Sequence, residues 1–278
     1  IIFSFLTFFL PVNVVYAGEI RMYTFAMLII SLMSIYAYRI YKNKNQKKLK
    51  NWILFALFSL CSAYTHYYGL MIAGLENLFL LIALIIEAKK ESKITYNLKA
   101  FILSAIAQIL LYLPWVMALL LQVKQVKSGF WIGIHFPETL LELFTFPFTG
   151  NLGGTIYVPV IFAILFGVVI YSYMIYIHAK NKKDENLKPA KLSFCFWLMI
   201  VIAACIVSVI IFRPIIYARY LLCTGGLFIF FIACIAYVIS TNVTIKICYI
   251  IFMGFTANIT IPISFSIIWA FPKIIRIY

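Results

Sequence analysis

The sequence predicts an all-α membrane protein, a bundle of about nine transmembrane helices. Of its 278 residues, 65% are hydrophobic and 11% are charged, and the mean hydropathy is +1.05. Soluble domains carry about 25% charged residues, so a water-soluble fold of this chain would lack polar side chains to cover its surface. Apolar stretches of membrane-spanning length fill most of the chain. Aromatic residues, which favour membrane interfaces, make up 18%.

Eight apolar stretches are candidate spans, because a transmembrane helix needs about 17–25 mainly apolar residues. Seven of these stretches suit one helix each. The stretch 51–87 does not: its 37 residues would form a helix of about 55 Å, against a hydrocarbon core of about 30 Å. The stretches are 1–16, 22–41, 51–87, 98–121, 156–177, 192–212, 217–239 and 246–268.

The long stretch 51–87 is predicted to be a hairpin of two short spans. Five lysines precede it and four follow it. Basic loops stay on the cytoplasmic side, so equal basic flanks require an even number of crossings. The polar break in the middle is Thr65-His66-Tyr67-Tyr68-Gly69. His66 is therefore expected near the outer surface, and the whole chain is expected to cross the membrane nine times.

The net charge of +15 is attributed to basic loops that set the orientation of the chain in the membrane. In a soluble protein it would suggest nucleic acid, but here the cations gather in short loops between apolar runs. Alternating the loops puts 16 basic residues inside and seven outside. The densest group, in loop 42–50, also suits anionic lipid headgroups. In the one long outer loop, 122–155, Glu138 and Glu142 have a spacing that predicts a short helix on the membrane surface.

Charge is costly in lipid, so charged residues at the outer ends of spans are candidate functional residues. Glu19 and Arg21 stand at the outer start of the span 22–41. A carboxylate there suits simple capping of the helix N-terminus. The functional interpretation makes Glu19 a ligand for a divalent metal ion or an acid near the acceptor. Arg21 would then bind a phosphate.

His66 shares the predicted outer side with Glu19. A histidine at a membrane interface is often only locally hydrogen-bonded, and the neighbouring Tyr67 and Tyr68 are ordinary interfacial residues. With Glu19, however, His66 forms a candidate catalytic pair that also offers ligands to a divalent metal ion. Glu76 lies deeper, in the second short span, and is predicted to face the interior of the bundle.

The segment 213–220 brings two arginines to an outer side that is otherwise poor in cations. Arg213 and Arg219 are seven residues apart, counting both, and Tyr220 follows directly. The guanidinium is a planar fork of donors that suits phosphate oxygens and stays charged. The alternative is that these arginines only anchor the span by reaching toward the interface. The functional interpretation assigns them to a lipid phosphate or pyrophosphate.

These motifs, in this order, resemble a known group of membrane enzymes. Glu19-Ile20-Arg21-Met22-Tyr23, then a span and a basic inner loop, then His66-Tyr67-Tyr68-Gly69, and finally Arg219-Tyr220, resemble the GT-C superfamily. Within it, the chain looks like the protein O-mannosyltransferases and aminoarabinose transferases of glycosyltransferase family 39. The resemblance covers most of the chain in layout and makes residues 1–278 one transmembrane domain.

The resemblance implies a glycosyltransferase of the cytoplasmic membrane, active on its outer face. The donor would be a polyprenyl-phosphate-linked sugar, and the acceptor a glycan, lipid or protein. The phosphate would be bound by Arg21, Arg213, Arg219 and Tyr220, while Glu19 and His66 would serve in catalysis or hold a metal ion. The principal acidic residue of the family lies after the first span, which is expected upstream of residue 1. A soluble C-terminal part is expected downstream.

Two other classes of function compete with this interpretation. A transporter or lipid flippase would favour inverted repeats and polar residues at mid-membrane, where only Glu76 is expected to lie. An O-antigen polymerase or ligase would also use a long outer loop and arginines. Substrate uptake into liposomes without sugar transfer would support the first, and product analysis would identify the second. The sugar and the acceptor are not encoded in any recognisable motif.

Overall fold

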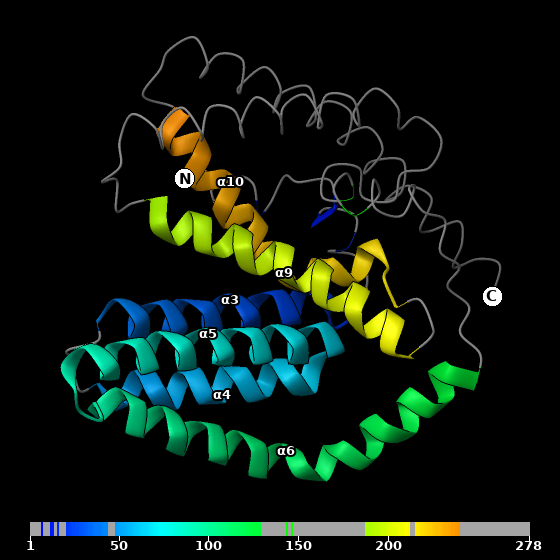
Figure 1. The fold of residues 1–278 in the computed structure, drawn as a ribbon. Helices are drawn as coiled ribbons and strands as arrows, with labels where there is room; N and C mark the ends of the chain where they lie inside the picture. The colour runs from blue at the N-terminus through cyan, green and yellow to red at the C-terminus, as the bar shows by residue number, and fades with distance from the viewer. Residues whose placement is uncertain are drawn as a thin grey trace, which may run out of the picture. The chain divides into compact units, whose positions relative to one another are not determined.

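The computed structural model describes residues 7, 12, 13, 16, 21–43, 48–128, 143, 146, 187–211 and 215–239. Every element in this part of the chain is helical (Figure 1). The chain divides into two compact units, one of Ile1–Ile20, Leu140–Lys191 and Ile229–Tyr278 and another of Arg21–Thr139 and Leu192–Phe228. The second unit holds most of the described residues. The elements are α3 (Tyr23–Lys42), α4 (Leu49–Thr65), α5 (Tyr67–Glu91), α6 (Tyr96–Ser128), α9 (Leu187–Ile211), the 3₁₀ helix η1 (Ala218–Thr224) and α10 (Gly225–Ile239).

The expected helical membrane architecture is confirmed in its coarse form. Four stretches, within α3, α5, α6 and α9, are long and apolar enough to cross a membrane. The expectation of nine spans is not confirmed. The predicted spans 156–177 and 246–268 lie outside the described residues, as does nearly all of 1–16 and the surface helix expected around Glu138. Helix α4 has 17 residues, or about 26 Å, which falls short of a hydrocarbon core of about 30 Å.

One predicted span begins differently from expectation. The stretch from Tyr217 was expected to be one α-helix, but its first turns form the 3₁₀ helix η1, and α10 starts only at Gly225. Gly225 and Gly226 are weak helix formers at this junction. Gly226 also lies so close to α3 that an added Cβ would stand 2.1 Å from the Ser31 hydroxyl oxygen. Close packing against α3 therefore accompanies the change of helix type.

The break predicted in 51–87 is confirmed and falls at His66, whereas the prediction that both helices cross a membrane stays a prediction, since α5 but not α4 has the length of a span. Helix α4 ends at Thr65 and α5 begins at Tyr67, so a single extended residue joins them. The Ser62 hydroxyl donates to the Gly69 carbonyl at 3.0 Å across the turn. A Cβ at Gly69 would lie 2.2 Å from the Ser62 carbonyl oxygen. The two helices approach this closely only because residue 69 has no side chain.

Polar side chains link α4, α5 and α6 at mid-length. Ser59 donates to the Gln108 side-chain oxygen at 2.6 Å, and Asn77 donates to the same oxygen at 3.2 Å. The Gln108 amide in turn donates to Ser104 at 3.0 Å. Such interhelical hydrogen bonds stabilise helix association in lipid, where apolar burial gives little drive. Glu76, expected to face the interior, is 0% exposed and contacts the Ser34 hydroxyl of α3.

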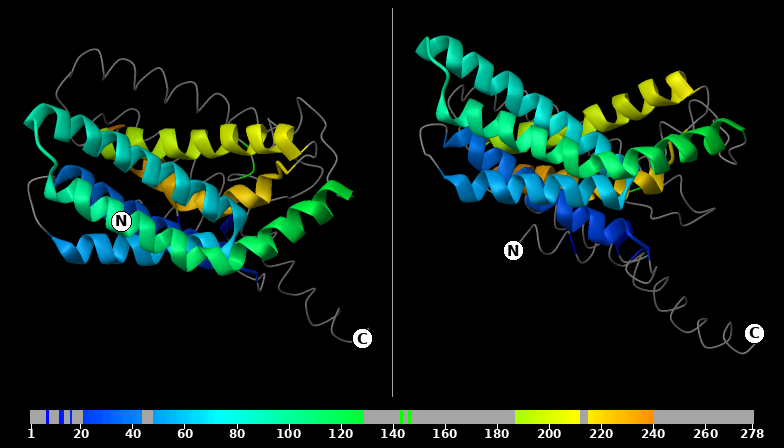
Figure 2. Two further views of the ribbon diagram at one scale, coloured as in Figure 1. Left: turned by 60° about the horizontal axis from the view of Figure 1, so that its bottom comes forward. Right: turned by 90° about the horizontal axis from the view of Figure 1, so that it is seen from below.

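Helix α6 contains a proline and bends there (Figure 1). Pro114 has no N–H to donate to the preceding turn, and its ring crowds the carbonyl four residues earlier. Near this bend the Tyr64 hydroxyl of α4 donates to the Leu111 carbonyl at 2.6 Å. A neighbouring side chain therefore hydrogen-bonds backbone near the bend, as is usual where proline interrupts a membrane helix. Figure 2 shows the same bend from two further directions.

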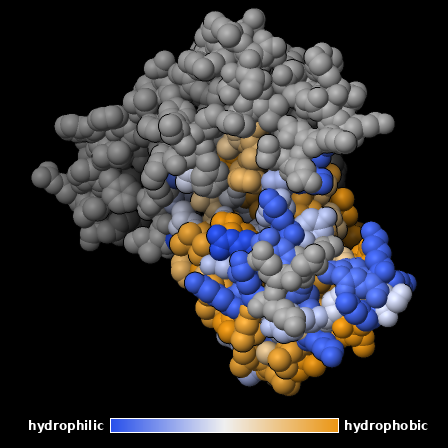
Figure 3. Space-filling view, turned by 90° about the vertical axis from the view of Figure 1, so that its left-hand side faces the viewer, coloured by the Kyte–Doolittle hydropathy of each residue, from blue (hydrophilic) through white to orange (hydrophobic). Residues whose placement is uncertain are grey.

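Basic residues gather at one end of the bundle. Helices α3 and α5 end with cations, and α4 and α6 begin with them, so alternating chain direction brings these residues together. Figure 3 shows hydrophilic side chains over this end, with hydrophobic ones around them. Lysine near a helix C-terminus also complements the helix dipole. The described cations of this basic end are Arg39, Lys42, Lys48, Lys50, Lys89, Lys90, Lys93 and Lys99.

Candidate functional site

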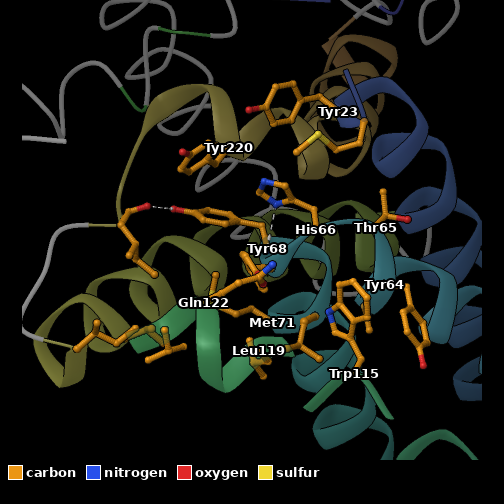
Figure 4. A pocket seen from close by; sticks show the side chains of 18 residues that line it. Tyr23, Tyr64, Thr65, His66, Tyr68, Met71, Trp115, Leu119, Gln122 and Tyr220 are labelled. Carbon is orange, nitrogen blue, oxygen red and sulfur yellow. Dashed lines mark hydrogen bonds between the residues drawn. The ribbon is translucent and has the colours of Figure 1, made fainter. Parts of the chain in front are cut away.

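The opposite end of the bundle carries a compact group of aromatic rings. It consists of Tyr23, His66, Tyr68 and Tyr220, which we call the aromatic cluster (Figure 4). The His66 ring centroid lies 5.7 Å from those of Tyr23 and Tyr68 and 5.4 Å from that of Tyr220. Tyr68 and Tyr220 are themselves 5.7 Å apart. These are normal spacings for interacting rings.

The cluster forms where helix ends meet. Tyr23 is the first residue of α3, His66 joins α4 to α5, Tyr68 is the second residue of α5, and Tyr220 belongs to η1. The Tyr68 hydroxyl donates to the Ile215 carbonyl at 3.2 Å, which ties the hairpin to the segment before η1. Tyr68 is 2% exposed and Tyr23 is 4% exposed. The cluster is therefore packed into the protein.

Two guanidinium groups lie beside the cluster. Arg21 is hydrogen-bonded to the Tyr23 side chain, and the charge of Arg219 also acts on Tyr23. The Arg219 guanidinium carbon lies 4.6 Å from the centre of the Tyr217 ring, in a cation–π contact. This contact orients the Arg219 side chain without neutralising its charge. The arrangement puts positive charge next to buried tyrosines.

His66 is neutral at physiological pH. Burial lowers its pKa from 6.5 to about 4, because the charged imidazolium loses its hydration. Its Nδ1 accepts a hydrogen bond from the Tyr68 backbone N–H at 3.2 Å. This bond caps the N-terminus of α5, where backbone donors otherwise lack partners. His66 thus has a structural role in the hairpin as well as a place in the cluster.

The cluster borders a cavity of about 570 Å³, within the range of small-molecule sites. The cluster residues line it on one side (Figure 4). Another wall is the part of α6 after Pro114, which contributes Trp115, Leu119, Gln122 and Val123. Most of the lining is apolar or aromatic. The remaining lining residues are Met22, Ala63, Tyr64, Thr65, Tyr67, Leu70, Met71, Val207, Ile211 and Ile215.

Four of the six predicted site residues come together at this end. Arg21, His66, Arg219 and Tyr220 are linked through the rings of the aromatic cluster. Glu19 and Arg213 lie outside the described residues. The Glu19–His66 pair suggested for a metal ion accordingly stays a prediction. Among the described residues, no three His, Cys, Asp or Glu side chains are grouped to hold a metal.

Sequence reasoning missed the α6 wall of the cavity. Trp115, Leu119 and Gln122 follow one another at helical spacing on the side of α6 that faces the cavity. The signal that could have found them is Pro114, a helix breaker in the middle of an otherwise uniform apolar stretch. In comparisons with known proteins, no family model, curated protein or solved structure matches this chain.

Proposed function

We propose that this protein is a membrane glycosyltransferase that takes a sugar from a polyprenyl-phosphate-linked donor on the extracytoplasmic face of the cytoplasmic membrane. The observation that carries the proposal is that the guanidinium groups of Arg21 and Arg219 lie beside Tyr23, a residue that lines a largely apolar cavity. The resemblance to the GT-C superfamily noted in the sequence points the same way. The acceptor is a glycan, lipid or protein of the cell envelope.

The chemistry of the donor matches this pairing. A prenyl chain needs an apolar surface, and the phosphate that joins it to the sugar needs cations close to that surface. Arginine binds phosphate oxygens through paired, charge-assisted hydrogen bonds. As the sugar leaves, negative charge grows on the phosphate, so preorganised cations lower the barrier to transfer. We assign this role to Arg21 and Arg219, together with Arg213, and place Tyr220 beside the phosphate.

The orientation follows from the basic end. Eight described cations lie at the end where α3 and α5 finish, and basic ends stay in the cytoplasm. The aromatic cluster then faces outward. Glu19 is assigned to orient the acceptor or to bind a divalent metal ion.

The proposal is tested by measuring transfer of radiolabelled sugar from a polyprenyl-phosphate donor to cell-envelope material. Arg219→Ala is expected to lower the rate by about 100-fold or more, since a transition-state charge loses its partner. Arg219→Lys keeps the charge without the fork and should fall between. Lys124→Ala, an exposed cation on α6, is the matched control and should transfer sugar at the wild-type rate.

Each contrary outcome has a definite meaning. Wild-type transfer by Arg219→Ala would remove Arg219 from the mechanism. Uptake of the sugar into liposomes without any transfer would contradict the proposed enzyme function and indicate a transporter.

A further inference from the structure

One nitrogen of the His66 ring is committed to the backbone. Its Nδ1 accepts from the Tyr68 N–H at 3.2 Å, and a nitrogen that accepts a hydrogen bond carries no hydrogen of its own. A neutral imidazole has one N–H, so the hydrogen of His66 sits on Nε2. The helix turn thus selects the tautomer.

The Nε2–H faces a site with no protein acceptor among the described residues. The ring is surrounded by the Tyr23, Tyr68 and Tyr220 rings, and the only hydrogen bond of its side chain within the described chain is the one at Nδ1. His66 lines the cavity. Figure 4 shows the imidazole among these rings, with the dashed bond to the backbone on one side. The other nitrogen is free to meet a ligand.

We propose that His66 donates its Nε2–H to a phosphate oxygen of the lipid donor, as a neutral hydrogen-bond donor rather than as a base or a metal ligand. This inference rests on the function proposed above. A base or a metal ligand needs a lone pair on Nε2. To provide one, the hydrogen would have to move to Nδ1, and the bond that caps α5 would be lost.

The position of the arginines supports a phosphate oxygen as the acceptor. Tyr23 touches the His66 ring and is also hydrogen-bonded to Arg21. Tyr220 touches the same ring and adjoins Arg219 in the chain. An anion bound between the two arginines would therefore lie near the imidazole. His66 then adds a directional donor to a site whose cations supply charge.

Two substitutions separate the cap from the donor. In His66→Asn the side-chain oxygen takes the place of Nδ1, and asparagine is among the best helix N-caps. The Nε2–H is lost. In His66→Gln the amide reaches the position of Nε2 and still donates, but the cap geometry is lost. His66→Asn should therefore keep the stability of the protein and lose ligand affinity, whereas His66→Gln should keep ligand affinity and lose stability.

The experiment measures binding of farnesyl phosphate to the full chain in lipid nanodiscs, with farnesol and inorganic phosphate as separate probes. Wild type should bind farnesyl phosphate more tightly than either probe. His66→Asn should weaken its binding by about ten- to hundredfold, the usual range for losing a hydrogen bond to a charged group, while melting near the wild-type temperature. His66→Gln should bind within about threefold of wild type and melt earlier.

The outcomes separate this inference from the proposed function. Failure of the wild type to bind farnesyl phosphate would overturn both. Normal binding by wild type and by His66→Asn would overturn only the role of His66. Loss of binding in both variants, together with loss on adding EDTA to wild type, would make His66 a metal ligand and also overturn the inference.

Discussion

The two ends of the α3–α6 bundle differ in how their side chains are packed and exposed. At the basic end, lysines such as Lys48, Lys90 and Lys99 stay exposed, and the ion pair there, Lys93 with Glu91 at 3.3 Å, is between exposed groups. Such pairs contribute little stability. At the other end the aromatic cluster is packed into the protein, and two of its rings are under 5% exposed. The basic end consists of exposed charges, whereas the aromatic end is built from packed side chains.

The aromatic end depends on close packing between helices, whereas the basic end does not. Exposed lysines tolerate many local geometries, because their effect on membrane topology depends only on how many lie on each side of the membrane. The aromatic cluster needs several chain segments to meet within a few ångströms, so it depends on the hairpin turn, while the cavity beside it depends on the bend in α6. Changes that disturb those two features should damage the aromatic end and leave the basic end intact.

The largest effect is expected at the hairpin turn. Gly69→Ala adds a Cβ 2.2 Å from the Ser62 carbonyl, and backbone cannot yield cheaply, so we expect a loss of about 3 kcal/mol in stability. Gly74→Ala is the matched control in the same helix. A Cβ there meets nothing within 4 Å, so this change should raise stability by about 0.5–1 kcal/mol. Unfolding in detergent followed by circular dichroism measures both, and equal effects would contradict the close approach at Gly69.

The hairpin shows what could be predicted from sequence. A mainly apolar stretch of 37 residues with lysines on both sides admits few arrangements, so a break near His66 follows from bilayer thickness and charge. A common location of His66, Arg21 and Arg219 at one end of the bundle was expected on the same grounds. Their convergence on Tyr23 was not, because which rings touch depends on how helices rotate against one another.

Other features escaped prediction for definite reasons. Hydropathy reports length and apolarity but is blind to helix type, so the 3₁₀ start at Ala218 was read as a continuous span. It is also blind to bends, so the wall after Pro114 was missed. The count of nine spans stays a prediction: four helices of the described part meet the length and hydropathy of a membrane span, and several predicted spans lie outside the described residues.

A smaller effect, on shape, is expected from Pro114→Ala. Restoring the N–H allows α6 to continue straight, which removes Trp115 and Leu119 from the cavity wall. Spin labels at Tyr67 and Lys124, both exposed, should move apart, as measured by pulsed electron spin resonance. Met117→Ala, an exposed position on the same helix, is the control and should leave the distance unchanged. An unchanged distance in Pro114→Ala would mean that tertiary packing imposes the bend.

The smallest effect is a dependence of stability on pH that is specific to the aromatic end. The pKa of His66 is about 4 in the folded protein and 6.5 when exposed, so between these values the unfolded chain binds more protons. Stability should therefore be level above about pH 6.5 and fall as the pH drops toward 4.

The difference between wild type and His66→Asn isolates this contribution, because asparagine keeps the cap of α5 but does not titrate. Melting temperatures measured from pH 8 to pH 4 should run parallel above pH 6.5 and separate below it, with wild type losing more. Because acidic groups elsewhere titrate identically in both proteins, their effect cancels. Parallel curves over the whole range would mean that the imidazole is hydrated in the folded protein, and the aromatic cluster would then be as open to water as the basic end.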